Sequence, residues 1–172
     1  KSFNDEYYDA LGAAGLLAGK INPLARTNVA PVRDAPSETM LYSFSATLPW
    51  AGGDWQPTFT ISGGGELERG GGLDRRSVVS LGDVSPAGLE AKARCVLDHM
   101  SFRLETLGVS WAQVTASCVY TAHPVHPLLD LLHETAGPAA VHGIRWFWSR
   151  PPIVDIEYEM DLQGVLEERV VA

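Results

Sequence analysis

The sequence has few cysteines and no long apolar run. Its 172 residues include two cysteines, Cys95 and Cys118, which lie in periodic segments and match no metal-ligand spacing. A low cysteine content is typical of proteins in a reducing compartment. We therefore expect Cys95 and Cys118 to be reduced core residues of a cytoplasmic protein. No apolar run approaches the roughly 18–20 residues that cross a bilayer, so no membrane partner is expected.

Basic side chains are also scarce. Thirteen Lys and Arg stand against 21 Asp and Glu, which gives a net charge of −8 with histidine neutral. Such a chain repels phosphate backbones and anionic membrane surfaces, so we expect no nucleic-acid partner. The GxSxG elbow of serine hydrolases and the GxxxxGK[ST] phosphate loop are both missing.

The five histidines do not form a recognisable metal motif. His123 and His126 are the closest pair, but Pro124 and Pro127 oppose the helical geometry that would aim both rings at one ion. No acidic or thiol ligand follows at a familiar spacing. The sequence therefore predicts no metal and no cofactor.

What is present suffices for one globular core, because 45% of the residues are hydrophobic and 20% are charged. Residues 4–17 are predicted to form a helix with Asn4 as its N-cap, followed by a proline-containing connector over 21–39. Residues 40–48 and 56–61 are expected to pair as a hairpin. The glycine-rich residues 62–73 then favour a mobile surface loop over a phosphate cradle.

The strongest helix signal covers residues 86–107. Ser85 is a good N-cap, Pro86 suits the first helical position, and apolar residues recur at spacings of three and four up to Gly108. Further elements are expected as a strand at 114–120, a short helix at 126–134, and strands at 140–149 and 153–162. This order predicts an α+β fold, a mixed sheet with two helices packed on one face and an extra N-terminal helix.

The last two strands are predicted to form a hairpin that places Arg145 opposite Glu157. Strict alternation puts four acids on one side of the final strand, namely Asp155, Glu157, Glu159 and Asp161. An arginine held by a cross-strand carboxylate is pre-oriented to receive a planar anion. The alternative is a structural ion pair on the sheet surface, and the acidic side itself is expected to be solvated.

Several segments resemble the RidA/YjgF family of imine deaminases, also labelled endoribonuclease L-PSP. Residues 28–49 (NVAPVRDAPSETMLYSFSATLP) resemble the family's opening strand region, and GGGELERGG its Gly-Glu-Leu turn. EAKARCVLDHM resembles the long-helix signature, Gly143-Ile144-Arg145 stands in place of Pro-Ala-Arg, and IVDIEYEMDLQGV resembles the last strand. The likeness runs from about Asn28 to Val165, which predicts an N-terminal extension over residues 1–27 and a RidA-like domain over 28–172.

The resemblance implies a chorismate-mutase-like homotrimer with sites in clefts between subunits. In such proteins an arginine binds the substrate carboxylate and a glutamate positions water for hydrolysis of an enamine or imine to a ketone and ammonia. Carried over, the arginine is Arg145, the serine position is Ser45, and the acid is Glu157 or, with one register change, Glu159. The expected partner is a small carboxylate-bearing substrate.

Four positions depart from the family's pattern. The usual pocket tyrosine corresponds to Val32, the glycine after the serine to Ala46, the small residue after the arginine to Phe147, and the asparagine of the short helix to Asp130. These changes predict a bulkier pocket and a substrate larger than 2-aminoacrylate, such as an aminomuconate-type intermediate. Two other hypotheses stay open, a non-catalytic carboxylate-binding regulatory trimer and an endoribonuclease.

Overall fold

The computed structural model describes residues 3–49, 52–54, 56–71 and 75–170. Its main sheet has the strand order β2-β6-β3-β4, with bounds β2 Phe59–Gly65, β3 Ala116–Tyr120, β4 Arg145–Phe147 and β6 Glu159–Gly164. Strand β6 runs antiparallel to both of its neighbours, whereas β4 runs parallel to β3. A second, two-stranded sheet pairs β1 (Ala30–Pro31) with β5 (Ser149–Arg150).

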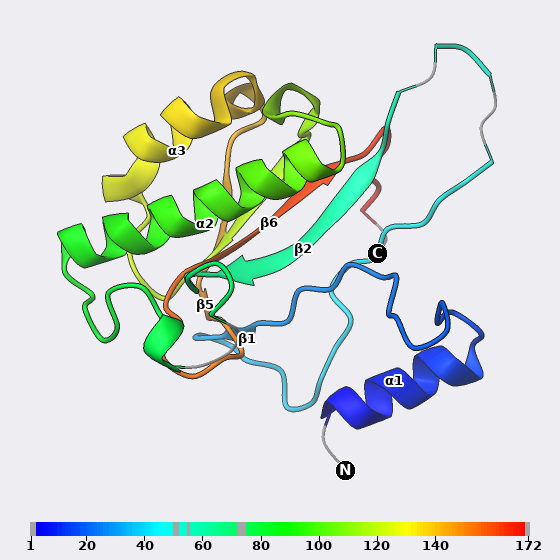
Figure 1. Cartoon of the computed structure of the whole chain (residues 1–172), viewed down its shortest axis with the longest axis horizontal. Coiled ribbons are helices and arrows are strands. Elements are labelled where there is room, and N and C mark those ends of the chain that lie inside the picture. The colour runs from blue at the N-terminus through cyan, green and yellow to red at the C-terminus, as the bar shows by residue number, and fades with distance from the viewer. Residues whose placement is uncertain (1–2, 50–51, 55, 72–74, 171–172) are drawn as a thin grey trace.

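Helices α2 (Pro86–Thr106) and α3 (Leu129–Ala136) lie together on one face of the main sheet, and α1 (Phe3–Ala13) lies on the other side (Figure 1). Short 3-10 turns occupy Arg75–Ser77, Trp111–Gln113, His126–Leu128 and Gly137–His142. This is the α+β arrangement predicted from the sequence, with its two helices on one face and its additional N-terminal helix. The predicted bounds of α2 are confirmed to within one residue, whereas α3 begins three residues later than predicted because residues 126–128 form a 3-10 turn.

The core lies between the two helices and the sheet. Helix α2 contributes the apolar positions that the sequence spacing predicted, and β6 contributes Met160 and Leu162, both almost fully buried. Because side chains alternate along a strand, the intervening Glu159 and Asp161 point to the opposite face. The packing of β6 against α2 therefore directs the acidic side chains of β6 to the face of the sheet away from the helices.

The N-terminus of α2 is capped as predicted. The Ser85 hydroxyl accepts a hydrogen bond from the Gly88 amide at 3.2 Å, and Pro86 occupies the first helical position. We expect Ser85→Ala to lower the free energy of unfolding by about 1 kcal/mol, because that amide loses its partner. Urea unfolding measures this, and Ser85→Asp, which keeps an acceptor, should retain most of the stability.

The predicted hairpin between residues 140–149 and 153–162 is wrong. After β4 the chain enters β5, which pairs with β1, and it returns as β6 between β2 and β3. Arg145 is consequently the register partner of Cys118 on β3. The strands that pair with β6 are distant from it in the sequence. Alternation along β6 therefore predicts which of its side chains share a face, but not which strands lie beside it.

Two further predictions about strands and loops are wrong. Residues 40–48 form no strand, and their large apolar side chains are 69–85% exposed, namely Met40, Leu41, Tyr42, Phe44 and Leu48. The first glycine triplet, residues 63–65, belongs to β2 and not to a loop. Its register against β6 shifts between Ile61 and Gly64, as at a β-bulge.

The glycines of β2 are required by close neighbours. A Cβ on Gly63 would lie 1.9 Å from Glu159 Oε1, and one on Gly65 would lie 2.7 Å from Ile156 Cγ2. Any side chain at these positions would displace the residues beside it. The bare backbone of β2 therefore leaves room for the carboxyl group of Glu159.

Candidate active site

The side of the main sheet away from α2 and α3, here called the open face, carries several functional side chains. Cross-strand partners share a face, so the pairings Cys118–Arg145, Cys118–Asp161, Tyr120–Phe147 and Tyr120–Glu159 place six residues together. These are Cys118, Tyr120, Arg145, Phe147, Glu159 and Asp161. Three of the predicted site residues, Arg145, Phe147 and Glu159, thus lie on the open face.

Glu159 is a buried acid with no hydrogen bond in the described part of the chain. Its residue is 8% exposed. Burial, together with the nearby acids Asp161 and Glu66, raises the pKa of its carboxyl group to about 7, whereas Arg103 opposes this shift. A carboxyl group with a pKa near neutrality can both accept and return a proton at physiological pH.

The Glu159 carboxyl lines a pocket of about 170 Å³. This volume is several times the ~30 Å³ that a water molecule occupies in the liquid, so the pocket suits part of a small metabolite. It is lined by one basic, one amide and one acidic residue together with glycines and apolar residues, namely Arg26, Asn28, Gly63, Gly65, Pro152, Ile153, Ile156 and Glu159. Such a wall fits an anionic molecule with an apolar body.

Asp161, two residues after Glu159 on β6, has a structural role. One carboxylate oxygen, Oδ2, accepts hydrogen bonds from Thr27 Oγ1 at 2.7 Å and from the Tyr120 hydroxyl at 2.8 Å. Thr27 Oγ1 also accepts the Gly63 amide at 3.0 Å. Asp161 therefore fixes the connector after α1 against the open face, beside the Glu159 pocket.

The thiol and phenol on the open face stay protonated at neutral pH. Burial, together with the charge of Asp161, raises the pKa of the Cys118 thiol to about 12. Burial also raises the pKa of Tyr120, and Asp161 acts in the same direction. Neither group is therefore available as an anionic nucleophile at neutral pH.

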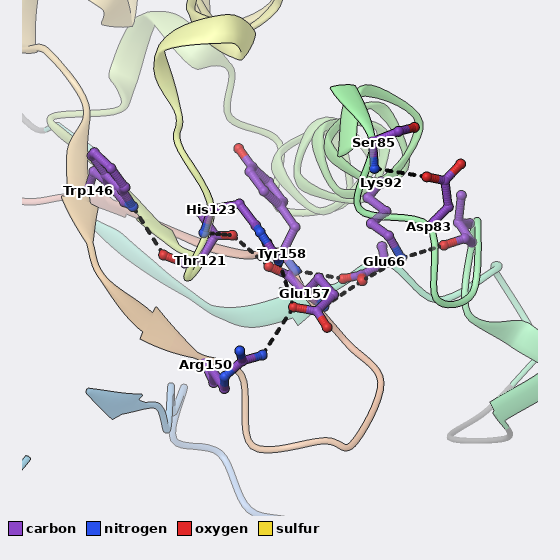
Figure 2. A network of polar contacts seen from close by, with 11 residues as sticks. Glu66, Asp83, Ser85, Lys92, Thr121, His123, Trp146, Arg150, Glu157 and Tyr158 are labelled. Atoms are coloured by element: carbon purple, nitrogen blue, oxygen red, sulfur yellow. Dashed lines mark hydrogen bonds and ion pairs between the residues drawn. The ribbon is translucent and has the colours of Figure 1, made fainter. Parts of the chain in front are cut away.

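Glu157 lies in a separate polar network (Figure 2). Its Oε2 is 2.8 Å from His123 Nε2 and accepts a hydrogen bond from Arg150 Nη1 at 3.3 Å. Its partner is thus not Arg145, so the predicted pairing is wrong. The Glu157 amide donates to Glu66 Oε1 at 2.6 Å, which joins this network to the buried interior.

The interior part of the network is a fully buried ion pair. Lys92 Nζ lies 3.2 Å from Glu66 Oε1, with both side chains 0% exposed, and it also donates to the Val79 carbonyl. The second Glu66 oxygen accepts the Tyr158 amide at 3.0 Å. Glu66 thereby holds the start of β6, and with it the positions of Glu157 and Glu159. The expectation that the acidic side of this strand is solvated is wrong, since Asp161 is also only 5% exposed.

Arg145 presents its guanidinium fork to a carboxylate from its own chain. Its Nη1 and Nη2 donate to the two oxygens of Glu168, each at 2.5 Å. The Arg145 side chain is 44% exposed. A bidentate partner on an exposed arginine shows that this fork can receive a planar carboxylate at the edge of the open face.

The remaining predicted site residues are not gathered around Arg145. Ser45 and Ala46 lie in the exposed segment 40–48, Val32 follows β1 and donates its amide to the Trp148 carbonyl, and Asp130 is exposed on α3. Segment 40–48 does approach the open face, because the Tyr42 ring packs edge-on against Phe147, with centroids 5.7 Å apart. Phe147 in turn stacks on Tyr120 at 5.2 Å.

Sequence reasoning missed Arg26, the His123–Glu157 contact and the Glu66–Lys92 pair. Lys92 gave a usable signal, because it falls on the apolar side of α2 between Leu89 and Val96. A lysine there requires a buried carboxylate partner. Arg26 had no such signal, since it stands in an aperiodic connector.

Neither a membrane helix nor a metal cluster is found within the described residues. None of their helices is long and apolar enough to cross a bilayer. No group of three or more His, Cys, Asp or Glu side chains among them could hold a metal ion.

Comparison with known proteins identifies relatives for almost the whole chain. Residues 1–169 match the family model described as "2-aminomuconate deaminase CnbZ". The chain is 36% identical over 171 residues to a 2-amino-5-chloromuconate deaminase of Comamonas testosteroni, which covers 98% of this chain and 67% of that protein. A crystal structure from Thermotoga maritima, described as a "putative endoribonuclease", is similar with 19% identity and a TM-score of 0.43 over 74% of this chain and 100% of that one.

Proposed function

Since this chain belongs to the 2-aminomuconate deaminase CnbZ family, whose members are RidA-like deaminases, we propose that it removes the amino group of a six-carbon amino-dienedioate by hydrolysis. The deaminase activity on aminomuconate-like intermediates predicted from the sequence is confirmed by this membership. The observation that supports the residue roles is the open face, where a carboxylate-binding arginine and a buried acid of near-neutral pKa occur on one sheet.

The proposed reaction consumes one water and releases one ammonia. The enamine first gains a proton on the carbon next to the amino-bearing carbon and becomes an imine. Water then adds to the C=N carbon, and the resulting carbinolamine expels ammonia to leave a ketone. The protein must hold the carboxylate beside that carbon and move a proton from the attacking water to the departing nitrogen.

Arg145 is proposed to hold the carboxylate next to the reacting carbon. Its fork already takes both oxygens of Glu168, so a substrate carboxylate replaces that side chain without any change in the donor geometry. Glu168 is half exposed at its side chain. An exposed ion pair of this kind contributes little to stability, so exchanging its carboxylate costs little.

Glu159 is proposed as the group that moves the proton. Both candidate acids lie near the start of β6, but the Glu157 carboxyl group already has His123 and Arg150 as partners. Glu159 faces the pocket and makes no hydrogen bond within the described chain. A general base of near-neutral pKa removes a proton from water more effectively than a paired carboxylate does.

The exposed apolar segment 40–48 supports the homotrimer as a further proposal. Five large apolar side chains in nine residues are unusual on a free surface and are typical of an interface. In a trimer this segment would bring Ser45 and Ala46 toward the site of a neighbouring copy. The homotrimer and the cytoplasmic location both stay predictions.

We expect Leu41→Asp combined with Phe44→Asp to convert the assembly into monomers, because two charges in an apolar interface cannot be desolvated cheaply. Light scattering coupled to gel filtration measures the mass. Val170→Asp, which changes an exposed valine outside this segment, is the control and should leave the mass unaltered. A trimeric double variant would rule out this segment as the interface.

The proposed function is tested by comparing substrates. Ammonia release is measured with a six-carbon 2-amino-dienedioate and with the three-carbon 2-aminoacrylate, after subtraction of spontaneous hydrolysis. We expect kcat/KM to be higher for the six-carbon compound, because the pocket beside Glu159 accommodates an apolar chain. Equal or inverted values would contradict the assignment of an aminomuconate-type substrate.

A further inference from the structure

Among the described residues that line the Glu159 pocket, Arg26 is the only basic one. It comes from the connector after α1, and sequence reasoning gave this residue no role. Glu159 lines the same pocket. A ligand bound there would therefore lie beside both a basic and an acidic residue.

Helix α1 positions the Arg26 guanidinium. Arg26 Nη2 donates to Asn4 Oδ1 at 3.0 Å, and the guanidinium carbon lies 4.5 Å from the centroid of the Tyr7 ring. Both partners are on α1. A guanidinium stacked on an aromatic ring loses less freedom when it binds an anion, so these contacts pre-organise the cation.

The pocket contains an acidic residue and apolar residues in addition to Arg26. Asn28 adds an amide beside Arg26, Ile153 and Ile156 supply apolar surface, and the bare backbone of Gly63 borders the Glu159 carboxyl. A ligand that fits has an anionic end, a flat apolar body and a reactive or polar group near Glu159. A six-carbon amino-dienedioate has this order of groups when its distal carboxylate meets Arg26.

We propose that Arg26 binds the carboxylate of the substrate that lies farthest from the amino-bearing carbon, and that α1 acts through Asn4 and Tyr7 to position it. This subsite rests on the proposed function, to which it adds the residue that selects dicarboxylates over monocarboxylates. The strand order supports this orientation of the substrate, because Glu159 on β6 lies between Arg145 on β4 and the Arg26 pocket beside β2. One cation for each carboxylate also overcomes the repulsion between a doubly charged anion and a protein of net charge −8.

The experiment measures binding without turnover. Muconate and sorbate share a six-carbon diene, but muconate has two carboxylates and sorbate has one. Isothermal titration of the full chain should show muconate binding about ten- to a hundredfold more tightly, which corresponds to one charge-assisted contact. Arg26→Gln should reduce this preference to within about twofold while leaving sorbate affinity unchanged.

Arg33→Gln is the matched control. Arg33 lies in the same connector with its guanidinium 4.2 Å from the Trp148 ring centroid, so the change removes a similar cation–aromatic contact outside the pocket. Its muconate preference should equal that of the wild type. Tyr7→Leu should weaken muconate binding in part, whereas Tyr7→Phe, which keeps the ring, should restore it. Circular dichroism confirms that each variant is folded.

The outcomes separate the two proposals. A wild type that binds muconate and sorbate equally, or an Arg26→Gln variant that keeps the preference, overturns the Arg26 subsite whatever the ammonia assay shows. Loss of the preference in Arg26→Gln supports the subsite, even if ammonia release fails and the proposed function falls. In turnover, Arg26→Gln should raise KM for the six-carbon substrate about tenfold or more with little change in kcat, because the contact lies away from the reacting carbon.

Discussion

Arg145→Ala is expected to lower kcat/KM for a six-carbon amino-dienedioate by about a hundred- to ten-thousandfold. Two charge-assisted hydrogen bonds to one carboxylate are lost together, and each contributes about 1.5–3 kcal/mol. The loss should fall on both KM and kcat, since the same contact binds the substrate and orients its reacting carbon. Coupled measurement of ammonia release gives both constants.

Two further variants isolate the cause of that loss. Arg145→Lys keeps the charge but removes the fork, so we expect it to recover only part of the activity. Arg94→Ala removes another exposed arginine, which pairs with Glu90 on α2, and should leave kcat/KM unchanged. Because the Arg145–Glu168 pair is exposed, Arg145→Ala should also leave the thermal unfolding midpoint nearly unchanged. More than half of the wild-type activity in Arg145→Ala would remove this arginine from the site.

Glu159→Gln is expected to reduce kcat by about a hundred- to ten-thousandfold, the usual contribution of a positioned general base. The wild-type kcat/KM should rise with pH as the Glu159 carboxyl loses its proton near its pKa of about 7. That rise should vanish in the glutamine variant. A pH–rate profile from pH 5 to 9 measures both effects.

The same substitution should stabilise the fold at high pH. The pKa of Glu159 is raised from 4.5 in the unfolded chain to about 7 in the fold, so the folded state holds the extra proton between these values. Stability should therefore fall as the pH rises from about 4.5 and level off above about 7, with a loss of about 3 kcal/mol. Glu159→Gln cannot ionise, so it should lack this slope and exceed the wild type in stability at pH 8.

Glu157→Gln is the matched control for both measurements. It makes the same chemical change two residues earlier, in a carboxylate that His123 and Arg150 already hold. We expect it to keep the wild-type decline in stability between pH 5 and 8, and to lose less activity than Glu159→Gln. The opposite ranking of the two variants would transfer the proton-moving role to Glu157.

The sequence predicted those features that depend on local pattern. Ser85 followed by Pro86 and an apolar spacing of three and four gives α2 its start and its buried side without reference to other elements. Alternation along the last strand likewise predicted that Met160 and Glu159 lie on opposite faces of the sheet. Arg145 was found from its place in a family motif, and the structure shows that its fork can take a carboxylate.

What the sequence could not predict depends on distant segments. The connector covers Asp161 through Thr27, 134 residues earlier in the chain, so an acidic side that alternation marked as solvated is buried. Insertion of β6 between β2 and β3 likewise separates Glu157 from Arg145. Arg26 joins the pocket through the same long-range packing. The sequence pattern thus identifies which side chains share a face of a helix or strand, whereas tertiary contacts determine which of these faces pack together.

The most direct measurement follows ammonia and substrate together in one reaction. The purified full chain is mixed with 2-aminomuconate, the loss of the conjugated enamine is followed by absorbance, and ammonia is quantified at the same time points. The account predicts one ammonia for each substrate consumed, at a rate that is proportional to enzyme and far above spontaneous hydrolysis. A rate equal to that of the buffer alone, or substrate loss without ammonia, would contradict it.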